Sequence, residues 1–213
     1  MFDIESIIIR IPGFLFAITI HEYAHGWMAL RKGDPTAYYA GRLTLNPIYH
    51  LDLFGTIALF LIGFGWAKPV PVNPGNLRDP QKDNLWISLA GPGSNMLCAL
   101  IFGIIIRFLD FSGMAFYDTS SVSAVLVSML IFAMQINIIL AVFNMIPIPP
   151  LDGSHILEGL LPRESLGWYY RIERYGPMIL MGIIMLGFIT QVHILWIFIS
   201  PFLRFFSYLF AGF

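Results

Sequence analysis

Long apolar stretches dominate this chain and limit what it can fold into. Several of them approach or exceed the roughly 18 to 20 residues that an α-helix needs to cross the hydrocarbon core of a bilayer. Of the 213 residues, 57% are hydrophobic and only 12% are charged, whereas about 25% of the residues of an ordinary soluble domain are charged. The sequence therefore predicts an all-α polytopic membrane protein.

The breaks between the apolar stretches suggest how the chain is organised. We expect membrane helices at about 4–30, 85–109 and 122–145, and one or two more between 177 and 211. Residues 51–66 are apolar but short and rich in glycine, so they either span or re-enter. Residues 38–49 and 66–73 mix Tyr, Thr and Val with turn residues, a pattern typical of short strands. The expectation is about five to six membrane helices, a short or re-entrant segment, and small strand-like elements.

Basic residues indicate which side of the membrane the loops face. Nine of the twelve Lys and Arg residues lie in residues 31–82 and 156–176, namely Arg31, Lys32, Arg42, Lys68, Arg78, Lys82, Arg163, Arg171 and Arg174. Loops rich in Lys and Arg stay in the cytoplasm, so these two regions are expected there and the N-terminus outside. Residues 1–20 lack the features of a removable signal peptide, so the first helix is expected to be retained. No block of like charges suggests a nucleic-acid partner.

A cluster of ionisable residues lies inside the first apolar stretch, in the motif HEYAH. His21 and His25 are four residues apart, so they project from one face of a helix and can bind one metal ion. Glu22 lies beside that face, where its carboxylate can take a proton from an attacking water molecule. Left unpaired in hydrocarbon, each group would cost several kcal/mol. The alternative is that the histidines only form hydrogen bonds with neighbouring helices.

A catalytic zinc ion usually takes three protein ligands, so a third residue is needed. Asp152 is the best candidate, because it is a carboxylate in the apolar, proline-rich sequence NMIPIPPLDG. Irregular backbone at membrane depth is tolerated where it is buried in protein or lines a watery cavity. Two alternatives stay open: Asp152 could cap the following helix, and His155 could be the ligand or support it.

The two motifs together resemble the paired signatures of the site-2 protease family of intramembrane zinc metalloproteases. GRLTLNP, GWAKPVPVNP and SLAGPGSN resemble connecting segments of its compact prokaryotic branch, which has no PDZ domain, so the resemblance covers about residues 10–160. The resemblance implies one zinc ion per chain with His21, His25 and Asp152 as ligands and Glu22 as general base. It also implies that Asn144 is a polar group near the scissile carbonyl, with Asn95 as a further candidate.

The predicted function is hydrolysis of peptide bonds in transmembrane protein substrates, in the plasma or inner membrane, with the active site toward the cytoplasmic side. A single integral-membrane domain over residues 1–213 is expected, with its catalytic core at about 4–160. A membrane transporter or channel that uses the buried polar groups for ion translocation is the alternative. A third possibility is a catalytically idle binding protein, against which the presence of Glu22 argues. Gln135 and Asn137 are expected to form hydrogen bonds between helices. Oligomeric state stays open.

Overall fold

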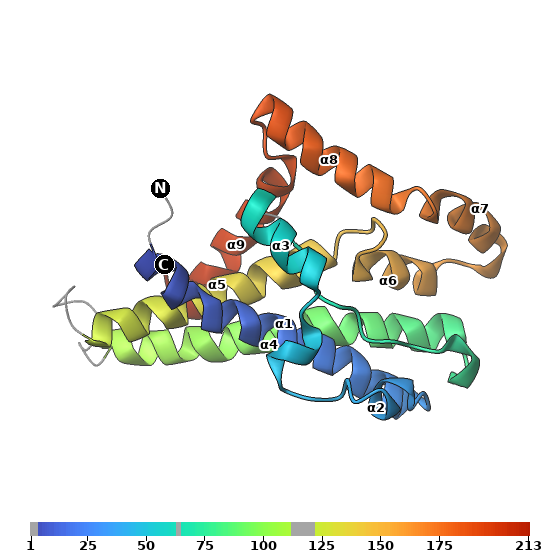
Figure 1. The fold of residues 1–213 in the computed structure, drawn as a ribbon, viewed down its shortest axis with the longest axis horizontal. Coiled ribbons are helices and arrows are strands. Elements are labelled where there is room, and N and C mark those ends of the chain that lie inside the picture. The colour runs from blue at the N-terminus through green and yellow to red at the C-terminus, as the bar shows by residue number, and fades with distance from the viewer. Residues whose placement is uncertain (1–3, 63–64, 112–121) are drawn as a thin grey trace.

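The computed structural model describes residues 4–62, 65–111 and 122–213, and the regular structure in these ranges is helical (Figure 1). The α-helices are α1 (Ile4–Lys32), α2 (Thr36–Tyr39), α3 (Leu53–Ile62), α4 (Pro80–Phe111), α5 (Val122–Asn144), α6 (Asp152–Leu160), α7 (Arg163–Glu173), α8 (Gly176–Thr190) and α9 (Ile194–Ala211). Two short 3-10 helices, η1 (Pro47–His50) and η2 (Pro74–Asn76), lie in the connections. The prediction of an all-α protein is confirmed.

Helix α4 lies at the centre of the molecule. It packs against α1, α5, α6 and α9, and α5 also packs against α1 and α9. Figure 1 shows α1, α4 and α5 running side by side as the body of the bundle. Apolar side chains of three helices form its main core, including Ile106 on α4, Met134 and Ile138 on α5, and Ile199 on α9. This packing holds α1 against α4 along the face that carries the two motif histidines.

Three helices among the described residues are long and apolar enough to cross a membrane: Pro80–Leu109, Val122–Asn144 and Ile194–Ala211. Helices α7 and α8 meet at a 51° bend and would add a fourth if they form one span. The chain is therefore a multi-pass membrane protein, but the expected count of about five to six membrane helices is not confirmed. The part of α1 that the structure describes is not among these candidates.

The expected strand-like elements do not form in the part of the chain that the structure describes. Helices α2 and η1 occupy the two ends of residues 38–49, and residues 66–73 contribute only an isolated bridge. Local hydrogen bonds account for this difference, because backbone carbonyls in turns and nearby side chains bind the backbone groups that a neighbouring strand would otherwise pair. The Asn46 side chain accepts a hydrogen bond from the Ile48 amide, and the His50 ring contacts the Thr44 carbonyl at 2.8 Å.

The two ends of the segment 51–67 lie side by side. Helix α3 has ten residues, which gives it a length of about 15 Å, half of what a bilayer core requires. Leu51 and Ala67 form an antiparallel bridge, and the Lys68 amide donates to the His50 carbonyl at 2.9 Å. Gly55 permits the close return, because a Cβ atom there would lie 2.9 Å from the Trp66 nitrogen. Of the two alternatives for this segment, the structure therefore favours re-entry over spanning.

Candidate metal centre

His21 and His25 face α4 from one side of α1, as their four-residue spacing predicts. Their rings make an edge-to-face contact, with 4.6 Å between the ring centroids. Gly91 is the residue of α4 that makes room for them. A Cβ atom at position 91 would lie 2.5 Å from His25 Cε1 and 2.7 Å from His21 Cε1. Glycine at this position therefore lets both imidazoles fit between the helices.

Each imidazole is held through its Nδ1 atom by a group on α4. His25 Nδ1 donates to the Ile87 carbonyl at 2.7 Å, and His21 Nδ1 lies 2.6 Å from Asn95 Oδ1. A carbonyl oxygen can only accept a hydrogen bond, so the proton of the neutral His25 ring lies on Nδ1. The Nε2 atom of His25 is then left with a free lone pair, which is the form of histidine that binds a metal.

Asp152 reaches the histidines from the first turn of α6. The proline-rich segment before it is tightly packed, since a Cβ atom on Gly153 would lie 2.5 Å from the Ile146 carbonyl oxygen. Ile146 and Leu151 of this segment are buried against Leu180 on α8. The helix-cap alternative is wrong, because Leu151 is the N-cap residue of α6 and no side chain caps the helix. The Asp152 carboxylate points instead toward the two histidines.

The three side chains form a compact group that could hold one metal ion. The Nε2 atoms of His21 and His25 are 3.0 Å apart. Asp152 Oδ2 lies 3.1 Å from His21 Nε2, and Asp152 Oδ1 lies 3.3 Å from His25 Nε2. In a tetrahedral zinc site with bonds of 2.0–2.1 Å, neighbouring ligand atoms are about 3.3 Å apart. The observed spacings therefore fit a zinc ion.

Hydrogen bonds do not explain why the polar atoms of this group lie so close together. Asp152 Oδ2 is buried and accepts no hydrogen bond, although a buried carboxylate oxygen without a partner is costly. His25 Nε2 faces the same carboxylate with its lone pair. Two nitrogen atoms and a carboxylate are a ligand set that zinc prefers. A bound cation would satisfy these atoms together, which is an independent reason to regard the group as a metal site.

Glu22 is buried next to this group but is not one of its three members. Its Oε2 atom accepts a hydrogen bond of 3.0 Å from the Val70 amide. Arg42 fixes the segment that provides this amide, because its guanidinium donates to the Lys68 carbonyl at 2.6 Å and to the Pro69 carbonyl at 3.3 Å. One carboxylate oxygen of Glu22 is thus anchored, and the side chain is held in a fixed orientation beside the histidines.

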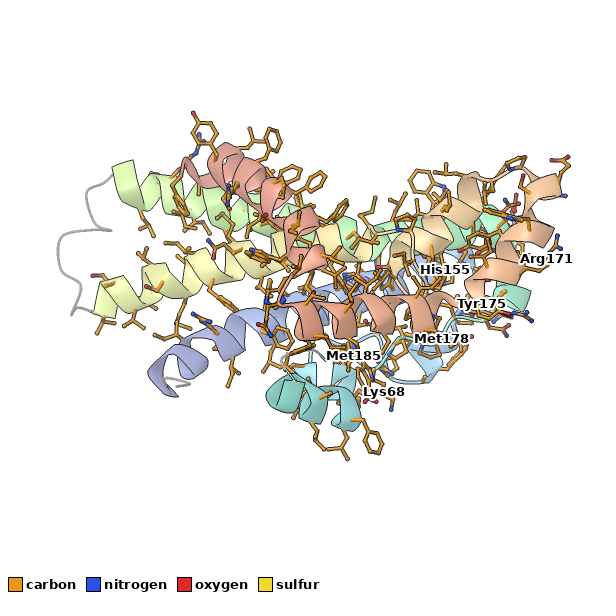
Figure 2. All side chains as sticks on the ribbon, turned by 90° about the horizontal axis from the view of Figure 1, so that it is seen from above. Lys68, His155, Arg171, Tyr175, Met178 and Met185 are labelled. Atoms are coloured by element: carbon orange, nitrogen blue, oxygen red, sulfur yellow. The ribbon has the colours of Figure 1, made fainter. Side chains whose placement is uncertain are left out.

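The other candidates occupy different places. Asn144 is the last residue of α5, and its Nδ2 atom donates to the carbonyl of Leu140 in the same helix at 3.0 Å. His155 lies on α6 outside the three-residue group, with its Nδ1 atom 3.5 Å from Glu158 Oε2 (Figure 2). Asn95 is fully buried against His21, and its Nδ2 atom donates to Asn137 on α5 at 2.7 Å. Asn137 therefore forms the expected hydrogen bond between helices.

Sequence reasoning did not identify three of the groups that position the site: Gly91, the Ile87 carbonyl and the Val70 amide. Backbone groups carry no signal in the residue type, so the last two could not be found from the sequence. Gly91 gave a usable signal, since a glycine in the interior of a helix is unfavourable and often marks a close approach.

A multi-pass helical protein with an HExxH helix and a converging aspartate belongs to the class of membrane metalloenzymes. The sequence profile described as peptidase family M50 matches residues 10–187, which is most of the chain. The chain belongs to this family, the site-2 protease family.

Individual relatives agree with this assignment. A Bacillus subtilis protein named "Putative zinc metalloprotease YwhC" is 38% identical over 184 residues, which cover 85% of this chain and 81% of that protein. "Putative zinc metalloprotease Rip2" of Mycolicibacterium smegmatis is 27% identical over 179 residues, or 82% of this chain and 65% of the relative. "Putative zinc metalloprotease MJ0611" of Methanocaldococcus jannaschii is 28% identical over 155 residues, which cover 73% of this chain and 70% of that protein. No solved structure matches the chain.

Family membership identifies the chain as a membrane metalloprotease with zinc as its cofactor. It favours the peptidase interpretation over the transporter alternative. The described residues contain no strand-rich insertion of the kind that a PDZ domain would form.

Proposed function

We propose that this protein cleaves peptide bonds of transmembrane protein substrates, at a zinc ion held by His21, His25 and Asp152. The observation that carries the proposal is the convergence of these three side chains from α1 and α6, with ligand atoms 3.0 to 3.3 Å apart. All three come from segments that pack against α4, the central helix of the bundle. A substrate that reaches this site would therefore approach through the membrane domain itself.

Zinc, when bound, supplies the positive charge that polarises a water molecule and the carbonyl under attack. Glu22 acts as the general base: it accepts the proton of the attacking water and later donates it to the leaving amine. Its Oε2 atom stays bound to the Val70 amide, so Oε1 is the oxygen that exchanges the proton. Asp152 and the histidines remain fixed throughout, because α4 and the proline-rich segment hold them.

Asn144 is proposed to donate a hydrogen bond to the substrate carbonyl as negative charge develops on its oxygen. In the structure its Nδ2 atom donates to Leu140, so its side chain must turn away from α5 to do this. Substrate binding would provide the new partner. Asn144→Ala is then expected to lower the cleavage rate and to leave zinc binding unchanged.

The location of the site follows from the same proposal. The regions rich in Lys and Arg begin in the last turn of α1 and within α6, and such loops face the cytoplasm. His21 and His25 lie in the second half of α1, toward that side. We propose that the protein resides in the cell membrane as one integral domain, that α1 also crosses the bilayer, and that cleavage takes place near its cytoplasmic face.

The test compares cells that express the wild-type protein with cells that express Glu22→Gln. Membrane proteins that accumulate uncut in the variant are candidate substrates, and each is then incubated with purified protein in lipid vesicles. The wild type should cut inside or beside an apolar segment, as mass spectrometry of the products can show. Glu22→Gln should retain zinc and cut at most at about a hundredth of the rate, since general base catalysis contributes about 10²- to 10⁴-fold. Cleavage at an equal rate by the variant would contradict the proposal.

A further inference from the structure

Two fully buried asparagines connect the His21 ring to α5. His21 Nδ1 lies 2.6 Å from Asn95 Oδ1, and Asn95 Nδ2 lies 2.7 Å from Asn137 Oδ1. Asn95 Nδ2 also donates to the Ala17 carbonyl at 3.0 Å, and Asn137 Nδ2 donates to the Ala133 carbonyl at 2.7 Å. The chain of hydrogen bonds therefore ends on backbone carbonyls in α1 and α5, with Asn95 of α4 between them.

The two carbonyls decide the direction of every hydrogen bond in this chain. A carbonyl oxygen can only accept, so the Asn95 atom that faces Ala17 must be the amide nitrogen. For the same reason the Asn137 atom that faces Ala133 is its nitrogen, and its oxygen faces Asn95. Both hydrogens of Asn95 Nδ2 are then used, and Asn95 Oδ1 is left as an acceptor facing His21. The proton of the neutral His21 ring must lie on Nδ1.

This direction has a consequence for metal binding. With the proton on Nδ1, the lone pair of His21 lies on Nε2, the atom that is 3.1 Å from Asp152 Oδ2. The opposite tautomer would place a hydrogen where a metal ion must sit. Asn95 can support the correct tautomer only while its amide plane stays fixed, and three groups fix that plane: the Ala17 carbonyl, Asn137 and His21 itself.

We propose that Asn95 and Asn137 select the metal-binding tautomer of His21, and that Asn137 is a positioning residue for the zinc site although it touches neither zinc nor its ligands. This proposal rests on the proposed function, because it assumes that His21 binds the metal. Groups that orient a metal-ligating histidine typically change metal affinity 10- to 100-fold when they are removed. Asn137 acts through one intermediate residue, so its removal is expected to fall at the low end of this range.

Two substitutions of nearly equal size separate the acceptor role from simple packing. Asn137→Leu removes the acceptor for Asn95, whereas Asn137→Asp, in the neutral acid form that a fully buried carboxyl adopts, keeps an oxygen facing Asn95 and donates its hydroxyl to the Ala133 carbonyl. Gln135→Leu is the matched control, since Gln135 is an amide on the same helix outside this chain of hydrogen bonds. Zinc affinity is measured on each purified protein by competition with a chromophoric chelator. We expect it to fall about tenfold in Asn137→Leu and to stay within about twofold of the wild type in the other two.

A second measurement does not depend on zinc or on activity. In zinc-free protein with ¹⁵N-labelled histidine, the nitrogen resonances of His21, assigned by comparison with His21→Ala, report which ring atom carries the proton. The wild type and Asn137→Asp should show protonated Nδ1, and Asn137→Leu or Asn137→Ala should show a mixture of both tautomers. If Asn137→Leu does not fold, Asn137→Ala replaces it in both measurements.

The outcomes separate this proposal from the proposed function. Unchanged zinc affinity and an unchanged tautomer in the Leu or Ala variant would overturn the tautomer proposal, as would an equal loss of affinity in Asn137→Asp and Asn137→Leu. If the wild type bound no zinc at all, the proposed function would fail, and the nitrogen resonances would still decide whether Asn137 sets the His21 tautomer.

Discussion

At the scale of single residues, the candidate metal site depends on a missing side chain as much as on the ligands. Gly91 faces both imidazole rings, whereas a Cβ atom on Gly93, two residues further along α4, would meet nothing within 4 Å. The two glycines lie on the same helix and flank Pro92, so they form a pair for comparison, and Gly91→Ser gives a second variant at the position before the proline.

Gly91→Ala is expected to displace the rings of His21 and His25 and to lower zinc affinity by at least about tenfold, because the ligands lose their fixed orientation. Gly93→Ala should bind zinc like the wild type. Competition with a chelator measures the zinc affinity of both variants. Equal zinc affinity in the two variants would mean that the close approach at Gly91 does not shape the site.

Val70 offers a second test at this scale, because its amide donates to Glu22. Proline at this position removes the donor, and Val70→Ala keeps it. We expect Val70→Pro to cut substrate at least about tenfold more slowly and to keep its zinc content. The reason is that a misplaced Glu22 loses much of the roughly 10²- to 10⁴-fold rate contribution of a general base. Val70→Ala should stay close to the wild type. Full activity in Val70→Pro would show that Glu22 does not need this anchor.

At the scale of elements, the segment that carries Val70 is tied to the end of α1 by one carboxylate. Asp34 is fully buried, and it accepts hydrogen bonds from the Asn73 amide at 2.7 Å and from the Asn76 side chain at 2.7 Å. Thr36 donates to the same carboxylate through its amide and its hydroxyl. Burial alone would raise the pKa of Asp34, but the hydrogen bonds from Asn76, Thr36 and Asn73 outweigh burial and lower it.

Because the pKa of Asp34 is lower in the folded protein, the ionised carboxylate stabilises the fold above the ordinary value of 3.8. This stabilisation is lost as the pH falls through the folded-state pKa. In Asp34→Asn, the new amide NH₂ group faces the hydrogen-bond donors of Thr36, Asn73 and Asn76 in place of an accepting oxygen. At pH 7 this substitution should therefore lower the unfolding free energy by about 1 to 3 kcal/mol. Thermal unfolding at several pH values would measure this, with the exposed Glu164→Gln as control. A difference between Asp34→Asn and the wild type that does not shrink below pH 3.8 would contradict this account.

The helices were predictable from the sequence to the extent that apolar length determines them. The stretches at 85–109 and 122–145 correspond closely to α4 and α5. The strand-like elements could not be predicted in this way, because the backbone of residues 38–49 forms its hydrogen bonds locally, in the turns around α2 and η1 and with side chains such as His50 and Asn46. Helix α3 could not be assigned from length alone, and the bridge between Leu51 and Ala67 favours re-entry over spanning.

The metal ligands were predictable for a different reason: ionisable residues are costly in an apolar stretch, so His21, His25 and Asp152 stand out. Asn95 was a weaker candidate and Asn137 an ordinary polar residue, since an uncharged amide in a membrane helix commonly binds a neighbouring helix. Their link to His21 depends on how α1, α4 and α5 pack. That packing is not visible in the pattern of any single helix.

At the scale of the whole molecule, several of the segments rich in Lys and Arg lie toward one end, while Lys68 lies nearer the middle in Figure 2. Figure 1 shows α2, the start of α4 and α7 at the same end of the bundle. Contacts join the start of α4 to the end of α1 and to α6, because Lys32 pairs with Asp83 at 3.1 Å and Gln81 donates to the Glu158 carbonyl at 2.9 Å. In Figure 2, Arg171 also lies toward this end. The arrangement agrees with a single cytoplasmic face, as the charge bias predicts.

Cysteine labelling in intact cells tests this orientation. In a Cys98→Ser background, the cysteine of Lys82→Cys should be protected from an impermeant reagent. The cysteine of Val122→Cys, at the first residue of α5, should be labelled. Ser112, in the connection expected outside the cell, should behave like Val122, although residues 112–121 lie outside the described part of the chain. If only the Lys82→Cys variant were labelled, the protein would have the opposite orientation to the one proposed.

Zinc content decides whether His21 and His25 bind a metal ion. Elemental analysis of the purified wild-type protein should find one zinc ion per chain, and His21→Ala, His25→Ala double substitution should remove it. His193→Ala is the matched control, because His193 lies at the start of α9, outside the three-residue group. The account predicts about one zinc ion in the wild type and the control and close to none in the double variant. Equal zinc in all three proteins would contradict it.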